Sequence, residues 1–293
     1  MDVEVKRFVA GRTPEGIRLS GTETTGWLGA LIVPAEPTVS LVVDLTSEAS
    51  DGFVVAGWMY RAAAPAVRGP QAWASLTLTL PEAHRLLGGR LGELAGPSQR
   101  LTEVLGADGR ELAERIGEAR TWEQRFAVMR GFSADRTTQG PAVVPGVLLA
   151  WRRLIESGGK VPIGAVAVEV GWSSQHLIRM FRRSFGHPPK TLARLLRLRA
   201  TLRRVRAEGR WEQAAFDAGY HDQAHFARDL RAFTGTSPSR YVRAALPCGC
   251  VRQANSLQDW ARDVSVASPH ARSQPDLHRE LQLRRRAGAQ RAL

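Results

Sequence analysis

Two predicted helices in the C-terminal half carry arginine and glutamine side chains on the face opposite their apolar residues. In the first helix, Leu177, Phe181 and Phe185 lie four positions apart, so rotation by about 100° per residue turns another set outward. That outward set is Gln175, Arg179, Arg182 and Arg183. In the second helix the outward residues are Ala224, Arg228 and Arg231, with Gln223 and His225 beside them near its start. Guanidinium and amide groups of this kind hydrogen-bond to the base edges and phosphates of DNA.

The two helices belong to an internal repeat. The first copy reads AVEVGWSSQHLIRMFRRSFGHPPKTL (residues 167–192), and the second reads AFDAGYHDQAHFARDLRAFTGTSPSRY (residues 215–241). Each copy runs Ala-x3-Gly-aromatic, then a polar residue, two apolar residues four positions apart and a Gly-x2-Pro ending. Gly171 and Gly219 can supply a left-handed turn, and Ser173 and Asp222 can cap the helix that follows. Each copy is therefore predicted to be a helix-turn-helix.

This tandem repeat resembles the DNA-binding domain of the AraC/XylS transcription regulators, over residues 145–244. The resemblance implies two helix-turn-helix units joined by a long helix over residues 190–206, with two recognition helices that enter successive major grooves. It also implies base contacts from Gln175, Ile178, Arg179, Gln223, Ala224, His225 and Arg228. Their chemistry fits, because arginine can bond guanine and glutamine can bond adenine in bidentate fashion. The residues better placed for phosphates are Arg182, Arg183, Lys190 and Arg231.

The sequence departs from the family pattern at Leu192, Trp211 and Leu230, which all remain apolar.

Charge is also distributed unevenly along the chain. Residues 1–140 carry 15 Lys and Arg against 17 Asp and Glu, a net −2, whereas residues 141–293 carry 26 against 11, a net +15. A strongly basic half favours double-stranded DNA as the partner. The alternative function is a nucleoid protein that binds nucleic acid without regard to sequence, which the ending RRRAGAQRAL would also suit.

Residues 1–140 are predicted to form a mixed β-sheet followed by short helices, which makes the chain α+β overall with an all-α second domain. Alternating or β-branched runs at 27–33, 38–45, 53–59 and 74–80 indicate strands, and helical spacing begins near residue 81. A linker is predicted over 137–145. The order resembles the sensor domain of one branch of the same family, often described as cupin-like, which implies effector sensing or dimerisation.

Four aromatic residues of this half are candidates for a small-molecule pocket: Trp27, Trp58, Tyr60 and Trp73. The alternative is that they simply fill a core. RNA polymerase, a small effector and a second copy of the chain are further partners that a regulator of this type could take.

Nothing in the sequence favours an enzyme. The G-x-S-x-G, P-loop and G-x-G-x-x-G motifs are absent, and no cysteine of the N-terminal half could accept a methyl group. His221 and His225 have the spacing of a metal pair without the Glu of H-E-x-x-H, and Cys248-x-Cys250 has no matching ligand pair. We therefore expect neither a metal nor a cofactor, and we interpret the lone His84 as structural.

Residues 247–293 lack sustained periodicity and are predicted to be a mostly disordered basic tail. The first ten residues do not resemble a secretory signal, and the longest nearly apolar run, 141–151, is too short to span a bilayer. The chain is therefore expected to be cytoplasmic and associated with the nucleoid, without membrane contact.

Overall fold

The computed structural model describes residues 5–12, 17–25, 31–32, 35–46, 51–57, 71–94, 96, 98–208, 211–235, 237–238, 241 and 251–252. Met1–Arg252 form one compact unit and Gln253–Leu293 form a second. The second unit lies outside the described residues. The predicted disordered tail, apart from residues 251–252, lies outside them too.

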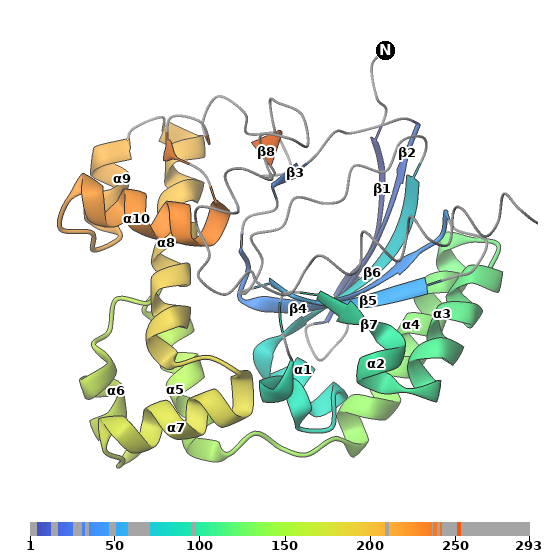
Figure 1. The fold of residues 1–293 in the computed structure, drawn as a ribbon, viewed down its shortest axis with the longest axis horizontal. Helices are drawn as coiled ribbons and strands as arrows, with labels where there is room; N and C mark the ends of the chain where they lie inside the picture. Colours follow the sequence, from blue (N-terminus) through green and yellow to red (C-terminus); the bar gives the residue numbers. More distant parts are fainter. Residues whose placement is uncertain are drawn as a thin grey trace, which may run out of the picture. The chain divides into compact units, whose positions relative to one another are not determined.

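Six strands form the main sheet, in the order β1-β2-β6-β4-β5-β7 (Figure 1). Their bounds are β1 Val5–Arg12, β2 Arg18–Thr24, β4 Thr38–Asp44, β5 Asp51–Ala56, β6 Gln71–Thr79 and β7 Ser98–Arg100. Each pairing within this sheet is antiparallel. A separate antiparallel ladder joins β3 (Leu31–Ile32) to β8 (Val251–Arg252). The runs at 38–45, 53–59 and 74–80 correspond to β4, β5 and β6.

Alternate residues of the central strands point into the core. In β6, Ala74, Leu76 and Leu78 are buried, while the residues between them are half-buried. This period of two is the one that the sequence displays at 74–80. Gly21 of β2 pairs with Ala74, and a Cβ atom at Gly21 would lie 2.0 Å from the ring of Trp122. The glycine therefore allows a helix to pack directly on the sheet.

The helices of the N-terminal part cover that face of the sheet (Figure 1). They are α1 Leu80–Leu86, the 3₁₀ turn η2 Arg90–Glu93, α2 Leu101–Leu105, α3 Ala107–Glu118 and α4 Trp122–Gln139. Trp122 stacks on Phe8 with ring centroids 4.7 Å apart, and its Nε1 donates to Glu23 Oε1 at 2.8 Å. These contacts fix the start of α4 on β1 and β2.

The linker between the two halves is shorter than the sequence predicts. Helix α4 continues to Gln139, and the next helix begins at Pro145. Thr137 remains helical because it is buried and its hydroxyl donates to the carbonyl oxygen of Ser133 at 2.6 Å. The Gly and Pro residues that indicate a linker lie only from residue 140 onward, so the helix extends three residues into the predicted linker.

The C-terminal half is helical, so the predicted α+β class is confirmed. Its helices are α5 Pro145–Glu156, α6 Ile163–Val170, α7 Ser174–Phe185, α8 Pro189–Glu208, α9 Trp211–Asp217 and α10 Gln223–Thr234. Leu192 and Leu230, two departures from the family pattern, are buried in the core, whereas the side chain of Trp211 lies outside the described residues. Among the described helices, none is long and apolar enough to cross a membrane.

Candidate nucleic-acid interface

The first helix-turn-helix unit consists of α6, α7 and the tight turn between them. Gly171 ends α6 with a φ of 76°, a left-handed conformation that favours glycine. The backbone N–H of Trp172 then donates to the carbonyl of Ala167 at 2.9 Å. Ser173 caps α7, since its hydroxyl accepts from the N–H of His176 at 3.2 Å. The predicted turn and cap are therefore both present.

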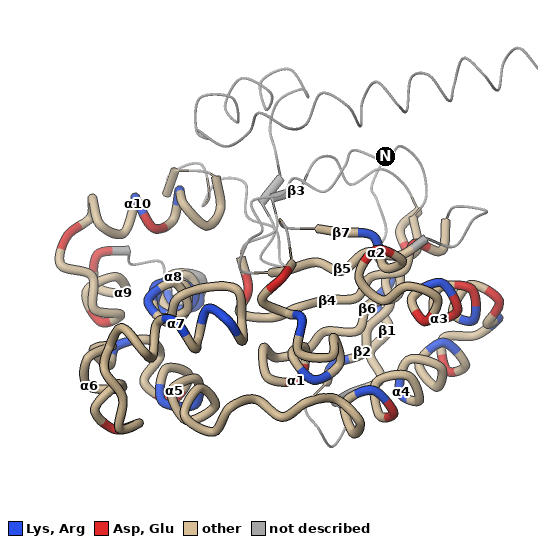
Figure 2. The backbone as a smooth tube through the Cα atoms, turned by 60° about the horizontal axis from the view of Figure 1, so that its bottom comes forward, with Lys and Arg blue, Asp and Glu red and all other residues tan. Residues whose placement is uncertain are grey.

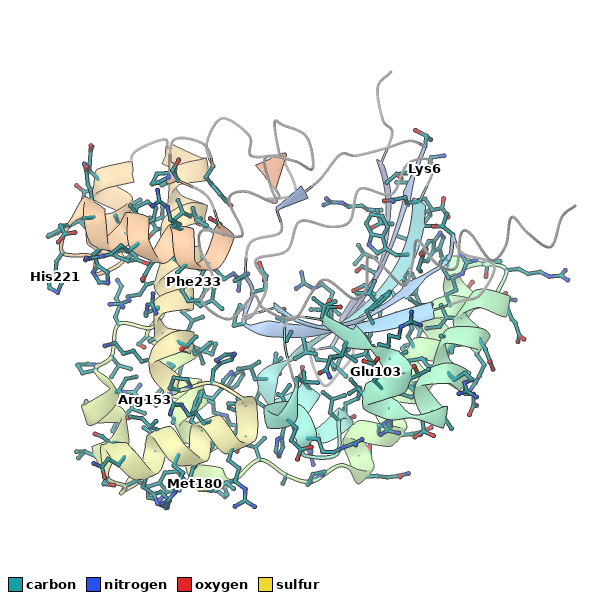
Figure 3. The ribbon with its side chains drawn as sticks, viewed as in Figure 1. Lys6, Glu103, Arg153, Met180, His221 and Phe233 are labelled. Atoms are coloured by element: carbon teal, nitrogen blue, oxygen red, sulfur yellow. The ribbon has the colours of Figure 1, made fainter. Side chains whose placement is uncertain are left out.

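Helix α7 has the two faces that the sequence predicts. Leu177, Phe181 and Phe185 are buried, and the two phenylalanine rings meet edge to face at 4.9 Å. The opposite face is exposed at Gln175, Arg179, Arg182 and Arg183, whereas Ile178 is half-buried. Figure 3 shows this helix around the labelled Met180. The face therefore leaves the predicted contact residues accessible to a ligand.

One contact on this face was missed by the sequence analysis. A guanidinium nitrogen of Arg179, Nη2, lies 3.0 Å from Nδ1 of His176. The His176 ring in turn meets the ring of Trp172 edge to face at 4.6 Å. Trp172 packs against α5 at Gly146, where a Cβ atom would lie 2.5 Å from the indole. The predicted base-reading arginine is thus connected through two rings to the body of the domain.

The second unit, α9 and α10, is built in the same way. Gly219 has a φ of 87°, and the N–H of Tyr220 donates to the carbonyl of Ala215 at 3.0 Å. Asp222 caps α10, with its Oδ1 accepting from the N–H of His225 at 2.6 Å. A histidine therefore occupies the third position of both recognition helices. His225 meets Tyr220 edge to face at 5.0 Å, much as His176 meets its tryptophan.

Helix α10 buries Phe226, Leu230 and Phe233. Its exposed predicted contact residues are Gln223, Ala224, Arg228 and Arg231, and His225 is half-buried. The rings of His221 and His225 stack with centroids 6.4 Å apart, and Figure 3 labels His221 just before this helix. The described residues contain no group of three or more possible metal ligands, and Cys248 and Cys250 lie outside them.

Gln223 has a partner that competes with DNA. Its Nε2 donates to Oε1 of Glu212 in α9 at 3.2 Å. A glutamine that binds adenine needs its amide for the base. The bond to Glu212 occupies one of the two N–H groups of Nε2, so only the other N–H and the amide oxygen remain for the predicted base contact.

A buried carboxylate anchors α10 to α8. Arg194 donates to Oδ1 of Asp229 from Nε at 3.0 Å and from Nη2 at 2.7 Å. The hydroxyl of Tyr220 donates to the other oxygen, Oδ2, at 3.3 Å. Burial, together with the nearby charge of Asp229, raises the pKa of Tyr220, so its hydroxyl stays protonated and remains a donor. Asp229 was not predicted as a site residue, because its arginine partner lies 35 residues away in the sequence.

The long helix α8 joins the two units, as the resemblance implies. Its apolar residues Leu192, Leu195 and Leu198 are buried, and Lys190 is exposed at its start. Figure 2 shows Lys and Arg positions along α7 and α8. Arg153 of α5 also forms an ion pair with Glu169 of α6, in the first unit, with Nε and Oε2 2.6 Å apart. The two units are therefore held to α8 and α5 by both apolar and charged contacts.

Elements of the N-terminal part contact α7 at its C-terminal end. Nδ1 of His84 in α1 lies 3.1 Å from the carbonyl oxygen of Ser184 and donates to it. Burial lowers the pKa of His84, and the hydrogen bond to Ser184 opposes that shift only in part. Gly92 of η2 approaches α7 so closely that a Cβ atom there would lie 2.4 Å from the carbonyl oxygen of Arg183. His84 therefore has the structural role that the sequence analysis assigned to it.

A second contact reaches α8. Glu36, which precedes β4, forms an ion pair with Arg199 at 2.8 Å, and both side chains are about a third exposed. The backbone N–H of Ala35 also donates to the carbonyl of Phe233, near the end of α10, at 3.4 Å. The sheet is thereby connected to the second unit as well as the first.

The predicted effector pocket is described only at Trp73. This residue is half-buried on β6, on the face opposite the buried Ala74 and Leu76, and pairs with Thr22 and Asp44 across the sheet. Trp27, Trp58 and Tyr60 lie outside the described residues. The pocket stays a prediction.

Comparison with known proteins supports the assignment of a helix-turn-helix domain to the helical half. A family described as a helix-turn-helix domain matches residues 166–244. No curated protein matches the chain. Among solved structures, the chain is similar to ToxT from Vibrio cholerae O395, with a TM-score of 0.39, 10% identity and coverage of 82% of this chain and 97% of ToxT. An unsaturated fatty acid-bound ToxT from Vibrio cholerae strain SCE256 gives a TM-score of 0.36 and 11% identity, covering 82% and 94%.

Proposed function

We propose that this chain, whose residues 166–244 are an AraC-type helix-turn-helix domain, regulates transcription by reading DNA with α7 and α10. The observation that carries the proposal is the equivalent construction of the two units. Each has a left-handed glycine, a capped recognition helix and an exposed arginine at the same helical position, Arg179 in one and Arg228 in the other. An indifferent DNA-coating protein would need neither this duplication nor this placement.

Each recognition helix carries its own set of proposed contact residues. The proposed base contacts are Gln175, Ile178 and Arg179 from α7, and Gln223, Ala224, His225 and Arg228 from α10. The proposed phosphate contacts are Arg182, Arg183, Lys190 and Arg231, all of them exposed. With α8 between the units, the two helices would enter successive major grooves about 34 Å apart on one face of the duplex.

The N-terminal part is proposed to modulate this binding, as a sensor of a small effector or as a dimerisation domain. The contacts of His84 with Ser184 and of Glu36 with Arg199 support the proposal, because they connect α1 and the residue before β4 to the recognition helix α7 and to α8. A change in the sheet would therefore reach both units through these contacts and not only through the linker between α4 and α5.

Selection from fragmented genomic DNA by the full chain, at two salt concentrations, tests the proposal. A regulator is expected to recover a bipartite motif with half-sites about one helical turn apart, retained at the higher salt. Binding that follows salt but shows no motif would contradict the proposal and favour the sequence-indifferent alternative.

The matched variants for this selection are Arg179→Ala, Arg228→Ala and Arg115→Ala. Each removes one positive charge from an exposed arginine, but Arg115 lies on α3 in the N-terminal part. Loss of motif information in the first two variants only would assign base recognition to α7 and α10.

A further inference from the structure

We infer that His176 is the positioning residue for base reading by the first unit, holding the Arg179 guanidinium in one orientation before DNA arrives. The inference rests on the proposed function, since it concerns how a base-reading arginine is presented. It adds a residue that neither the sequence repeat nor the exposed face identifies. His176 itself need not touch DNA.

The direction of the hydrogen bond follows from the chemistry of arginine. A guanidinium only donates, so Nδ1 of His176, 3.0 Å from Nη2, must be the acceptor. The imidazole is therefore neutral in this arrangement, with its proton on Nε2. One guanidinium N–H is used for the histidine, and the others stay available for the O6 and N7 acceptors of guanine.

The histidine ring is itself held in one orientation, so it can orient the guanidinium of Arg179. Its backbone N–H is bonded to the Ser173 cap at 3.2 Å, and its ring lies edge to face against Trp172 at 4.6 Å. The indole fills the space beside Gly146 of α5, where even a methyl group would clash at 2.5 Å. Orientation is thus transmitted from α5 through Trp172 and His176 to Arg179.

Fixing a long exposed side chain in advance has a measurable consequence. A free arginine loses its rotamer freedom when it binds a base, and this loss costs affinity in the cognate complex. An arginine that is already ordered before binding avoids this loss, which corresponds to about two- to tenfold in affinity for one such side chain. The gain applies only where a guanine accepts the guanidinium, so it appears as discrimination between bases rather than as general affinity.

The second unit provides an internal contrast. His225 occupies the same position in α10 and also lies against an aromatic ring, Tyr220 at 5.0 Å. Within the described residues, however, Arg228 has no hydrogen bond to it, and the His225 ring stacks on His221 instead. The first unit therefore has a preoriented arginine and the second unit does not.

A double-mutant cycle on the full chain tests the inference, with wild type, His176→Phe, Arg179→Ala and the double variant. Kd is measured on the selected site and on sites with each base pair substituted in turn. Phenylalanine keeps a ring against Trp172 but removes the acceptor nitrogen. We expect it to lose about two- to tenfold in discrimination at the base pair read by Arg179, and to have no further effect once Arg179 is alanine.

A rescue variant separates positioning from packing. In His176→Asn the amide oxygen lies close to the place of Nδ1, so an acceptor returns without the ring. We expect discrimination at the same base pair to recover at least in part. Should His176→Phe fail to fold, His176→Leu also lacks the acceptor and takes its place in the cycle.

Two results would overturn the inference. One is a His176→Phe effect that weakens all sequences equally or persists unchanged beside Arg179→Ala, which would give His176 a merely structural role. The other is an Arg179→Ala variant that keeps its discrimination at every base pair. This second result would refute the proposed base contact itself, so failure of the inference and failure of the proposed function are distinguishable.

Discussion

Arg194 in the linking helix α8 and Asp229 in the recognition helix α10 form a two-bond ion pair, with Nε and Nη2 donating to Oδ1 at 3.0 and 2.7 Å. The carboxylate of Asp229 is almost fully buried, and the Arg194 side chain is 34% exposed. The same guanidinium lies 5.4 Å from the ring centroid of Phe233, one turn further along α10. The orientation of the recognition helix α10 relative to α8 is therefore set by this charged contact together with the apolar core.

Removing the buried carboxylate should destabilise the domain more than removing an exposed one. Asp229→Ala removes a buried carboxylate that accepts from both Arg194 and the buried hydroxyl of Tyr220, and we expect a loss of ~3 kcal/mol in the free energy of unfolding. The control is Asp217→Ala, which breaks the more exposed ion pair with Arg204 and should cost about 1 kcal/mol or less. Urea unfolding of both variants measures the difference. Equal losses would mean that the Arg194 pair contributes no more than a surface contact.

Glu212 should weaken DNA binding in the wild-type chain. It accepts a hydrogen bond from Gln223 at 3.2 Å and places a negative charge next to a proposed base contact. Glu212→Gln is expected to bind the selected site about two- to fivefold more tightly at low salt, with the gain shrinking as salt screens the charge. Glu114→Gln, on an exposed position of α3, makes the same charge change in the N-terminal part and should leave Kd unaltered. Unchanged binding by Glu212→Gln would show that its carboxylate lies away from the bound phosphates.

The helical half could be predicted from the sequence because the residues that determine each helix, its cap and its turn are close together in the chain. The spacing of Leu177 and Phe181 sets the buried face of α7, and Gly171 with Ser173 sets its start, all within one short stretch. The same reasoning applied to Phe226 and Leu230 gives α10. Repetition of one pattern then confirms both assignments, since two helices with the same local signals fold alike.

The rest depends on contacts between distant residues. Asp229 resembles a surface acid in the sequence, and only its arginine partner on α8 makes it a buried anchor. His176 was overlooked because a single half-buried histidine has no sequence signature until the Trp172 and Arg179 side chains surround it. Strands β1 and β2 were missed for a related reason, because charged and polar residues interrupt VKRFVAGR and RLSGTET. β1 is a strand through its pairing with β2, and β2 pairs in turn with β6.

Stability should fall as the pH drops through the range in which the buried His84 and the half-buried His187 titrate. Burial lowers the pKa of His84, and burial together with the charge of Arg182 lowers the pKa of His187. As the pH falls below the ordinary value of 6.5, the unfolded chain takes up these protons before the folded chain does, so folding loses free energy until the lowered pKa values are passed. This contribution is fully present above pH 6.5.

Urea unfolding at a series of pH values between neutral and mildly acidic checks this expectation. In His84→Asn the dependence on pH should become shallower, because one of the two groups is gone while an amide can still donate to Ser184. His221→Asn, at an exposed position, is the control and should keep the wild-type slope. A slope that is the same in His84→Asn and wild type would show that His84 takes no part.

The contact between η2 and α7 should respond to a single methyl group. At Gly92 a Cβ atom would lie 2.4 Å from the carbonyl oxygen of Arg183, which is backbone and cannot move without shifting the helix. Gly92→Ala is therefore expected to lower the free energy of unfolding by ~1–3 kcal/mol. Gly131→Ala on α4 is the matched control, since a Cβ atom there meets nothing within 4 Å. Because alanine favours a helix interior over glycine, this control should gain ~0.5–1 kcal/mol. Thermal or urea unfolding distinguishes the expected loss of stability in Gly92→Ala from the expected gain in Gly131→Ala. A Gly92→Ala chain as stable as wild type would mean that η2 is not in tight contact with α7.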